Sequence, residues 1–159
     1  MIFDRENLLK TFQGIPEIIE TYFKCISEEY LDKKRSETSW TIREHLYHII
    51  GVQEMLYMRI MKIKNEENPV ITPYFPENES TGVPPFDSIQ KAFSYYREIR
   101  AKQILLINQL TEAELAKEAK HDEYIEYSIP IIINHMIFHE YWHMYRIEEI
   151  WLTRDEYFS

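Results

Sequence analysis

Apolar side chains recur at alternating steps of three and four residues along four long segments of this sequence. An α-helix has 3.6 residues per turn, so this spacing places the apolar side chains on one face of a helix. The segments span residues 8–26, 42–63, 89–110 and 132–150. Four amphipathic helices bury their apolar faces most simply in an antiparallel-type four-helix bundle. We therefore predict an all-α fold, and a single domain over residues 1–159 because no repeat or change in composition divides the chain.

Glycine is scarce, and this supports an all-helical chain. The 159 residues include only 3 glycines, whereas a turn-rich β sandwich or barrel needs many more. No stretch approaches the ~20 apolar residues that cross a membrane. The N-terminal residues carry acids where a signal peptide carries bases. These features predict a cytoplasmic protein with no membrane partner.

The net charge of the chain is −9, from 18 basic and 27 acidic residues. Such a chain repels the phosphate backbone of nucleic acids, and no basic run offsets this repulsion locally. We therefore predict no nucleic-acid partner. The single cysteine, Cys25, has no second cysteine with which to form an internal disulfide. Its place in the first apolar pattern predicts a half-buried residue of a helix.

A proline and a capping motif mark helix boundaries in the first half of the chain. Pro16 interrupts the first segment and predicts a kink, or a helix that starts near it. Thr41 and Glu44 form a capping box, S/T-x-x-E, which predicts that the second helix starts at Thr41. The apolar pattern then continues to Ile63 and ends at Asn65.

Residues 65–86 form one long irregular segment, which holds five of the 7 prolines of the chain. A loop of this length in a small domain is usually either functional or a long crossover between helices. We predict a long crossover loop between the second and third helices that also covers one end of the bundle. Asp87 and Gln90 resemble another capping box and predict the start of the third helix.

The remaining boundaries lie in the last third of the chain. Thr111 and Glu114 predict one more short capped turn, and residues 117–127 are polar and ambiguous. The last helix is predicted to enter at Ser128, with Pro130 in its first turn, where a proline loses no helical hydrogen bond.

Two histidines stand on the inner stripe of the last helix, where leucine would be ordinary. The stripe consists of Ile132, Met136, His139, His143, Ile147 and Ile150. Residues four apart on a helix have Cβ atoms ~5–6 Å apart, so His139 and His143 can bind one ion together. A lone histidine on such a stripe is more often a hydrogen-bonded core residue, but two at this spacing favour a metal site. A third histidine would leave a coordination position open for water or substrate, as in catalytic metal sites.

Two other metal motifs match this helix and are excluded by their context. The sequence HEYWH, residues 139–143, matches the zinc-protease motif H-E-x-x-H, with Glu140 as general base. Only 16 residues follow His143, which we expect to leave little room for a downstream ligand, and no strand-rich segment precedes the motif. Glu140 and His143 also form one copy of the di-iron motif Glu-x-x-His, but that site needs a second copy. Residues 44–48 read Glu-x-x-x-His instead.

Three stretches of the sequence resemble the DinB-like (DinB/YfiT-like) superfamily of metalloenzymes. They are WTIREHLYHI (residues 40–49), LTEAEL (residues 110–115) and NHMIFHEYWHMYRIEEI (residues 134–150). The resemblance implies a four-helix bundle, a homodimer, and one metal ion bound by a histidine of the second helix and two of the last. Carried over by position, these ligands are His48, His139 and His143.

The resemblance leaves two other histidines open. His45 lies one turn before His48, and His135 lies one turn before His139. His45 is a candidate for a mere neighbour of the site, for a proton relay, or for the metal ligand in place of His48. We interpret both as supporting or merely structural residues. Three imidazoles suit several divalent ions, so Zn or Ni is favoured, with Fe and Mn as alternatives.

The same resemblance implies an activity, because characterised relatives include thiol S-transferases that use bacillithiol or mycothiol. We predict a metal-dependent transferase in which the ion activates a low-molecular-weight thiol for attack on a small electrophile. The alternative enzyme is a metal-dependent hydrolase that uses bound water, with Glu44 or Glu140 as proton acceptor. His45 is a third candidate catalytic residue. The non-enzymatic alternative is a metal-stabilised homodimeric bundle. Three aromatic residues are candidates for pocket lining or for ordinary packing: Tyr47, Trp142 and Tyr145.

Overall fold

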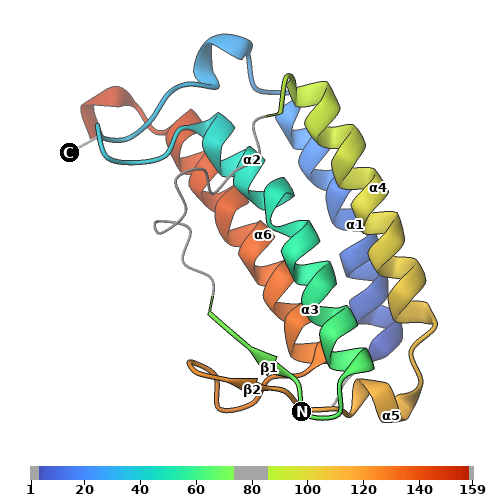
Figure 1. Cartoon of the computed structure of the whole chain (residues 1–159). Helices are drawn as coiled ribbons and strands as arrows, with labels where there is room; N and C mark the ends of the chain where they lie inside the picture. Colours follow the sequence, from blue (N-terminus) through green and yellow to red (C-terminus); the bar gives the residue numbers. More distant parts are fainter. Residues whose placement is uncertain (1–3, 74–85, 158–159) are drawn as a thin grey trace.

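A four-helix bundle forms the body of the computed structural model, which describes residues 4–73 and 86–157 (Figure 1). Its long helices are α1 (Arg5–Phe23), α2 (Ile42–Gly51) with α3 (Gln53–Asn65), α4 (Ile89–Asn108) and α6 (Ile129–Leu152). Shorter elements are the 3-10 helices Glu28–Tyr30 and Asp155–Tyr157, α5 (Glu112–Leu115), β1 (Val70–Ile71) and β2 (Lys120–His121). The predicted all-α bundle is confirmed, with its second helix in two parts.

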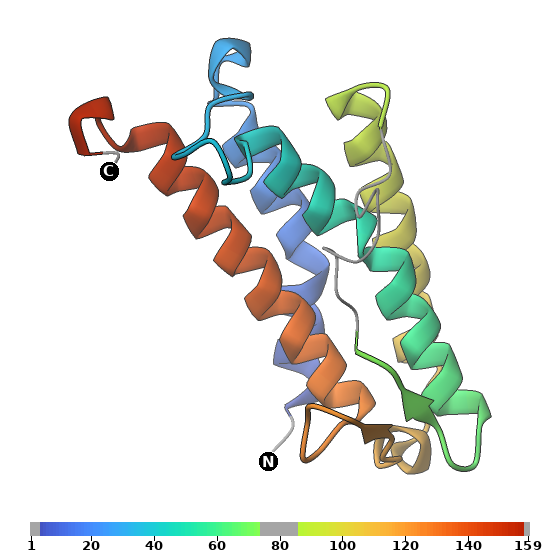
Figure 2. The same cartoon turned by 60° about the vertical axis from the view of Figure 1, so that its left-hand side comes forward.

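The helices do not all run antiparallel to their neighbours. Both α6 and α4 contact α1, α2 and α3, so α1 stands opposite α2 and α3 across the bundle. Figures 1 and 2 show that α1 and α6 run in one direction, and α2, α3 and α4 in the other. The bundle is therefore not antiparallel throughout, because the predicted crossover after α3 returns the chain to the end at which α2 began.

The predicted apolar stripes form the core. Every long helix contributes fully buried side chains, for example Ile15, Ile19, Leu46, Ile49, Ile60, Tyr96, Met136 and Ile147. Burial of one isoleucine or leucine contributes about 1.5–3 kcal/mol. Packing of these stripes therefore stabilises the helices more than their intrinsic propensity does. No helix within residues 4–73 and 86–157 has both the length and the apolar character of a membrane-spanning segment.

Capping boxes start two of the helices as predicted. The backbone N–H of Glu44 donates to the Thr41 hydroxyl (3.1 Å), and the Glu44 carboxylate accepts from the N–H of Thr41 (2.7 Å). Thr111 and Glu114 make the same reciprocal pair at α5. The helix α6 follows Ser128 and carries a proline in its first turn, also as predicted.

The start of α4 corrects the third capping prediction. The Ser88 hydroxyl, not the Asp87 carboxylate, accepts from the N–H of Lys91 (3.2 Å). Asp87 pairs instead with the Lys91 ammonium group. The helix begins one residue later than the box of Asp87 and Gln90 requires, because Ser88 has the extended backbone from which a cap side chain reaches the third N–H.

The helix α1 passes through Pro16, so the predicted helix start near this proline is wrong. The helix begins at Arg5, where the Asp4 carboxylate caps it. Proline has no N–H, which leaves the carbonyl of Phe12, four residues earlier, without its helical donor. The Arg100 guanidinium of α4 donates to that carbonyl. A side chain of a neighbouring helix thus satisfies the group that Pro16 leaves unpaired.

Two further boundaries differ from the predictions. Because α1 ends at Phe23, Cys25 lies outside the helix and is exposed rather than half-buried.

The second helix is interrupted at Val52. There the Gln53 side-chain amide donates to the Ile49 carbonyl (2.8 Å), which in an unbroken helix would accept from the Gln53 backbone N–H. A side chain that enters the helical ladder in this way bends a helix.

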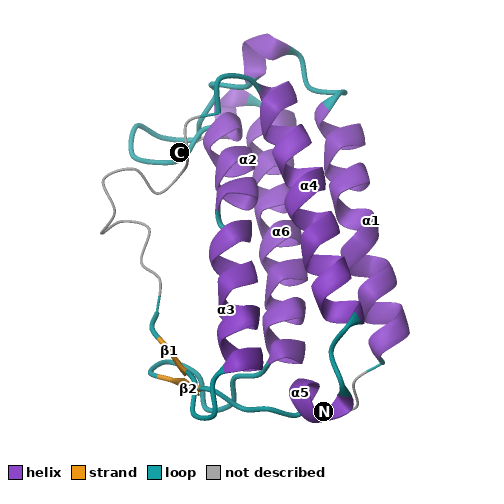
Figure 3. Cartoon of the chain, turned by 45° about the vertical axis from the view of Figure 1, so that its right-hand side comes forward, coloured by secondary structure: helices purple, strands orange, loops and turns teal. Residues whose placement is uncertain are grey.

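The crossover from α3 to α4 begins with β1, which pairs in parallel with β2 and sets Ile71 opposite His121. The two strands lie in segments 65–86 and 117–127, which the sequence left irregular or ambiguous. With α5, they lie at the end of the bundle where α3 ends and α6 begins (Figure 3). The prediction that the crossover covers one end of the bundle depends in part on residues 74–85, which lie outside the described residues.

Candidate metal centre

Three histidines singled out by the sequence converge between α2 and α6. His48 lies near the end of α2, and His139 and His143 lie one turn apart in the middle of α6. The Nε2 atom of His139 is 3.1 Å from Nε2 of His48 and 3.1 Å from Nε2 of His143. One ring nitrogen of each histidine lies within 4.8 Å of the other two. Among the described residues, this is the group of metal-ligating side chains that the fold brings together.

The spacing of these nitrogens fits a shared divalent cation. Two nitrogens that bind zinc at ~2.0–2.1 Å in tetrahedral geometry lie roughly 3.3 Å apart. Three ring nitrogens that face one another cannot all be paired by hydrogen bonds, since one N–H serves one acceptor at a time. The Nδ1 atoms of His48 and His139 are buried and have no partner among the described residues, so neither ring is satisfied from its other side. A cation would satisfy all three facing nitrogens together.

Burial keeps the three imidazoles neutral at cellular pH. It lowers the pKa of His48 to about 4. Burial, with neighbouring histidines as a second cause, lowers the pKa of His139 to about 3 and the pKa of His143 to about 2. Neutral imidazole is the form that binds a metal, because protonation occupies the lone pair. The side chains are therefore ready to act as ligands near pH 7.

His45 and Trp40 hold the ligands in place. Nδ1 of His45 is 2.8 Å from Nδ1 of His143, so a His143 ring that offers Nε2 to a metal would donate its Nδ1–H to His45. The Trp40 ring packs on His48, with centroids 4.8 Å apart, and stacks on His143 at 5.8 Å. Sequence reasoning missed this role for Trp40, whose one signal is its place directly before the helix-capping Thr41.

His135 lies beside the cluster and outside its three nitrogens. Its ring is nearly parallel to the His139 ring, at 6.0 Å between centroids. Its Nδ1 atom lies 3.2 Å from the hydroxyl of Tyr124. His135 thus lies next to the His139 ring, and its own polar contact is with Tyr124.

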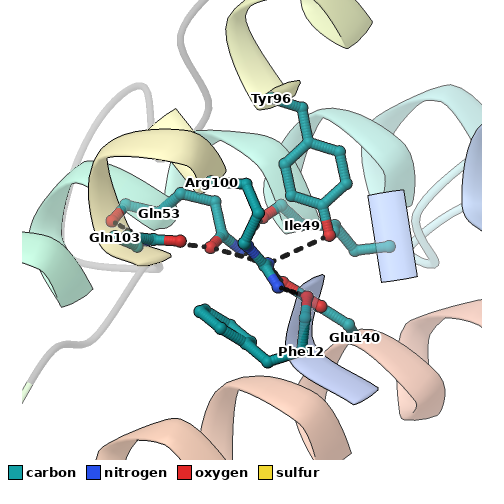
Figure 4. A network of polar contacts seen from close by, with 7 residues as sticks. All are labelled: Phe12, Ile49, Gln53, Tyr96, Arg100, Gln103 and Glu140. Atoms are coloured by element: carbon teal, nitrogen blue, oxygen red, sulfur yellow. Dashed lines mark hydrogen bonds and ion pairs between the residues drawn. The ribbon is translucent and has the colours of Figure 1, made fainter. Parts of the chain in front are cut away.

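Neither glutamate that the sequence offered as a proton acceptor lies in the cluster. Glu44 is exposed and caps α2. Glu140 is fully buried in the core, where its carboxylate pairs with Arg100 and accepts from the Gln53 amide (2.7 Å) (Figure 4). Burial raises the pKa of Glu140, and the Arg100 guanidinium opposes this shift. We therefore assign Glu140 to the core network and Glu44 to the start of α2.

A cavity of about 250 Å³ adjoins the cluster on the side of α3. His48 and His139 form part of its wall. The other described residues that line it are Val52, Met55, Leu56, Arg59, His121, Glu123, Tyr124, Tyr127 and His135. The aromatic residues proposed from the sequence are not part of this lining. Trp142 contacts the His143 ring elsewhere, with centroids 4.7 Å apart, and Tyr47 packs against Phe86.

Acid should destabilise the metal-free protein through these buried histidines. Burial also lowers the pKa of His45, to about 4. In the unfolded chain each histidine titrates near ~6.5. Because the folded-state pKa values are lower, the unfolded state takes up protons first. Stability is therefore complete above pH ~6.5 and falls as the pH decreases through the interval toward ~4, by up to about 1.4 kcal/mol per pH unit for each histidine.

Urea unfolding of the metal-free protein between about pH 7.5 and about pH 5 measures this loss. A variant in which His48, His139 and His143 are replaced by glutamine should show a much flatter profile. The same pH dependence in both proteins would show that other groups cause it.

The sequence and the fold match known proteins over most of the chain. A model of the DinB superfamily matches residues 11–151. Two proteins of Oceanobacillus iheyensis, each named "Putative metal-dependent hydrolase", are 23% and 24% identical over 148 and 149 residues. Each match covers 92% of this chain, and the two cover 86% and 85% of the relatives.

Two solved structures have the same fold. YfiT from Bacillus subtilis is described as "a probable metal-dependent hydrolase with an unusual four-helix bundle topology". It matches with a TM-score of 0.81 at 16% identity, over 94% of this chain and 88% of YfiT. YjoA, a DinB-like protein from the same species, matches with a TM-score of 0.54 at 16% identity, over 93% of this chain and 94% of YjoA. At these identities the structures establish the shared bundle, and the activity has to be argued from the site.

Proposed function

This chain belongs to the DinB superfamily, and on that premise we propose that it is a metal-dependent transferase that joins a low-molecular-weight thiol to a small electrophile. The observation that carries the proposal is the convergence of three neutral imidazoles, with no carboxylate among them in the described residues. His48, His139 and His143 would hold the ion, and His45 and Trp40 would fix the orientation of two of the rings.

The ligand set determines the chemistry that the site can support. Neutral ligands leave the charge of a divalent ion uncompensated. When bound, such an ion supplies the Lewis acidity that favours the ionised form of a thiol or of water. Imidazole ligands suit Zn²⁺ and Ni²⁺. The rings of His48 and His143 are buried, and electrostatic interactions are stronger in a site from which water is largely excluded.

A thiol suits this site better than water because neither of the two candidate carboxylates, Glu44 and Glu140, stands beside the cluster to take a proton from water. An unperturbed thiol has a pKa of about 8.5, whereas bulk water has a pKa of about 15.7. Both candidate carboxylates are engaged elsewhere, Glu44 at a helix start and Glu140 in the core. A thiol therefore ionises at this site without the help of a carboxylate base, which water would need more. The names of the Oceanobacillus relatives support a metal-dependent hydrolase as the second candidate.

An activity assay on zinc- and nickel-loaded protein separates these functions. Transfer of cysteine, glutathione or bacillithiol to 1-chloro-2,4-dinitrobenzene or monochlorobimane should exceed the rate without enzyme and disappear when a chelator removes the metal. Hydrolysis of p-nitrophenyl esters that depends on the metal and not on a thiol would replace the transferase by the hydrolase. Metal binding with neither reaction would favour the non-catalytic bundle.

The homodimer implied by the resemblance stays a prediction, and we propose the outer face of α6 as its surface. Four exposed aromatic residues stand there at helical spacing: Phe138, Tyr141, Trp142 and Tyr145. Exposed apolar groups that gather in this way are typical of interaction surfaces. Because Trp142 also touches the His143 ring, a partner on this face would lie next to the metal centre.

A further inference from the structure

We propose that the cavity beside the histidine cluster binds the anionic end of a small substrate, a carboxylate or a phosphate, through Arg59. The inference rests on the proposed function, since it places this anion next to the groups that would hold the metal. It adds a substrate class and a recognition residue to the site.

The cavity has the position and the size for such a substrate. His48 and His139 form one part of its wall, and Arg59 of α3 forms another. Its volume of about 250 Å³ is just below the ~300–1,000 Å³ that is usual for drug-sized ligands. A small molecule bound there would touch both Arg59 and the metal-binding side chains. If Arg59 binds the anionic end of a substrate, the other end of the substrate can reach His48 and His139.

Arg59 carries a charge that no carboxylate among the described residues neutralises. Its Nη1 donates to the Tyr127 hydroxyl (3.0 Å), and its Nη2 donates to the Thr72 carbonyl (2.8 Å). Both acceptors are neutral. The ion pairs between described residues involve other cations throughout. In a chain with a net charge of −9, a half-buried cation held only by neutral groups beside a cavity is well suited to an anion.

The two hydrogen bonds also orient the guanidinium. They engage both terminal nitrogens, Nη1 with the Tyr127 hydroxyl and Nη2 with the Thr72 carbonyl. A guanidinium held in this way binds carboxylate or phosphate with less loss of entropy than a mobile lysine. Around it, the walls offer further neutral polar groups, such as the hydroxyl of Tyr124 paired with His135 (3.2 Å). The carboxylate of Glu123 also lines the cavity, but Glu123 is exposed, so water screens its repulsion of an anion.

Calorimetric titration of the zinc-loaded protein with matched thiols tests the inference. The probes 3-mercaptopropionate and 2-mercaptoethanol share a thiol and differ in carboxylate against hydroxyl. Propionate and inorganic phosphate lack the thiol and report an anion site on their own. We expect at least one of the anionic probes to bind about tenfold tighter to the wild type than to Arg59→Met, since a charge-assisted hydrogen bond is lost.

Two variants control for charge and for folding. Lys62→Met removes a positive charge from the next turn of α3, outside the cavity lining, and should bind the probes like the wild type. Arg59→Lys keeps the charge and should retain part of the anion affinity. Thermal unfolding of Arg59→Met shows whether loss of the Tyr127 and Thr72 contacts has disturbed the fold.

The outcomes separate this inference from the proposed function. Tighter binding of 3-mercaptopropionate that depends on Arg59 places the anion on the thiol. Binding of propionate or phosphate alone that depends on Arg59, with equal affinity for both thiols, places it on the electrophile. Thiol binding without any effect of Arg59 on the anions overturns the anion site and leaves the transferase intact. Anion binding that depends on Arg59, without any thiol binding, supports the anion site and contradicts the transferase.

Discussion

Replacement of His139 by alanine is expected to leave the protein with almost no bound metal. The Nε2 atom of His139 is the one that lies 3.1 Å from both other ligand nitrogens, so its loss leaves two imidazoles without their shared neighbour. We expect near one ion per chain in the wild type and near none in the variant. Metal at ~1,000 times its dissociation constant stabilises a folded protein by about 4 kcal/mol, a gain that His139→Ala should lack.

Elemental analysis of protein purified without a histidine tag, with thermal unfolding before and after a chelator, measures both effects. His135→Ala is the matched control, because it makes the same change one turn earlier on the same helix and outside the cluster, and it should keep its ion. His45→Ala should bind metal about 10–100-fold more weakly, since His143 loses the partner of its Nδ1 atom. A full complement of metal in His139→Ala would contradict the ligand set.

The positions of the long helices follow from local sequence, and the departures from prediction follow from contacts across the fold. The capping box of Thr41 and Glu44 and the apolar stripes involve residues within one or two turns, so a pattern reveals them. The interruption at Val52 depends on which carbonyl the Gln53 amide reaches. The strands β1 and β2 are two residues each and about fifty residues apart in sequence, too short to leave a periodic signal.

The sequence identifies the metal ligands more completely than the residues that surround them. The spacing of His139 and His143 is a local signal of a shared ion, whereas the choice of His48 over His45 came from the family resemblance. The packing of α2 against α6 determines which of the two faces the cluster, and no spacing within α2 reveals that packing. Glu140 is the opposite case. Adjacent helical residues are turned by about 100°, so Glu140 points into the core, to a partner on α4 that a single sequence does not identify.

The partner of Glu140 on α4 is Arg100, and replacing it by methionine (Arg100→Met) is expected to lower the free energy of unfolding by about 3–5 kcal/mol. The Arg100 guanidinium is almost fully buried and pairs with the Glu140 carboxylate, which is itself fully buried (Figure 4). It also donates to the Tyr96 hydroxyl (3.3 Å) and to the Phe12 carbonyl, which Pro16 deprives of a helical donor. Methionine has a similar length and no charge, so it leaves the buried Glu140 carboxylate without its countercharge, with the Gln53 amide as a remaining partner, and the buried Phe12 carbonyl without a donor.

Urea unfolding at neutral pH measures the change in the free energy of unfolding. Arg97→Met is the matched control, because Arg97 lies one turn earlier on α4 and makes an exposed ion pair with Glu20, which is worth about 0–1 kcal/mol. Glu140→Leu combined with Arg100→Met should recover much of the loss, because both buried charges are then gone. Adding Pro16→Ala to that pair should recover more, because alanine restores the N–H that the Phe12 carbonyl accepts in a regular helix. A loss below about 1 kcal/mol in Arg100→Met, equal to that of the surface control, would show that the network does not stabilise the bundle.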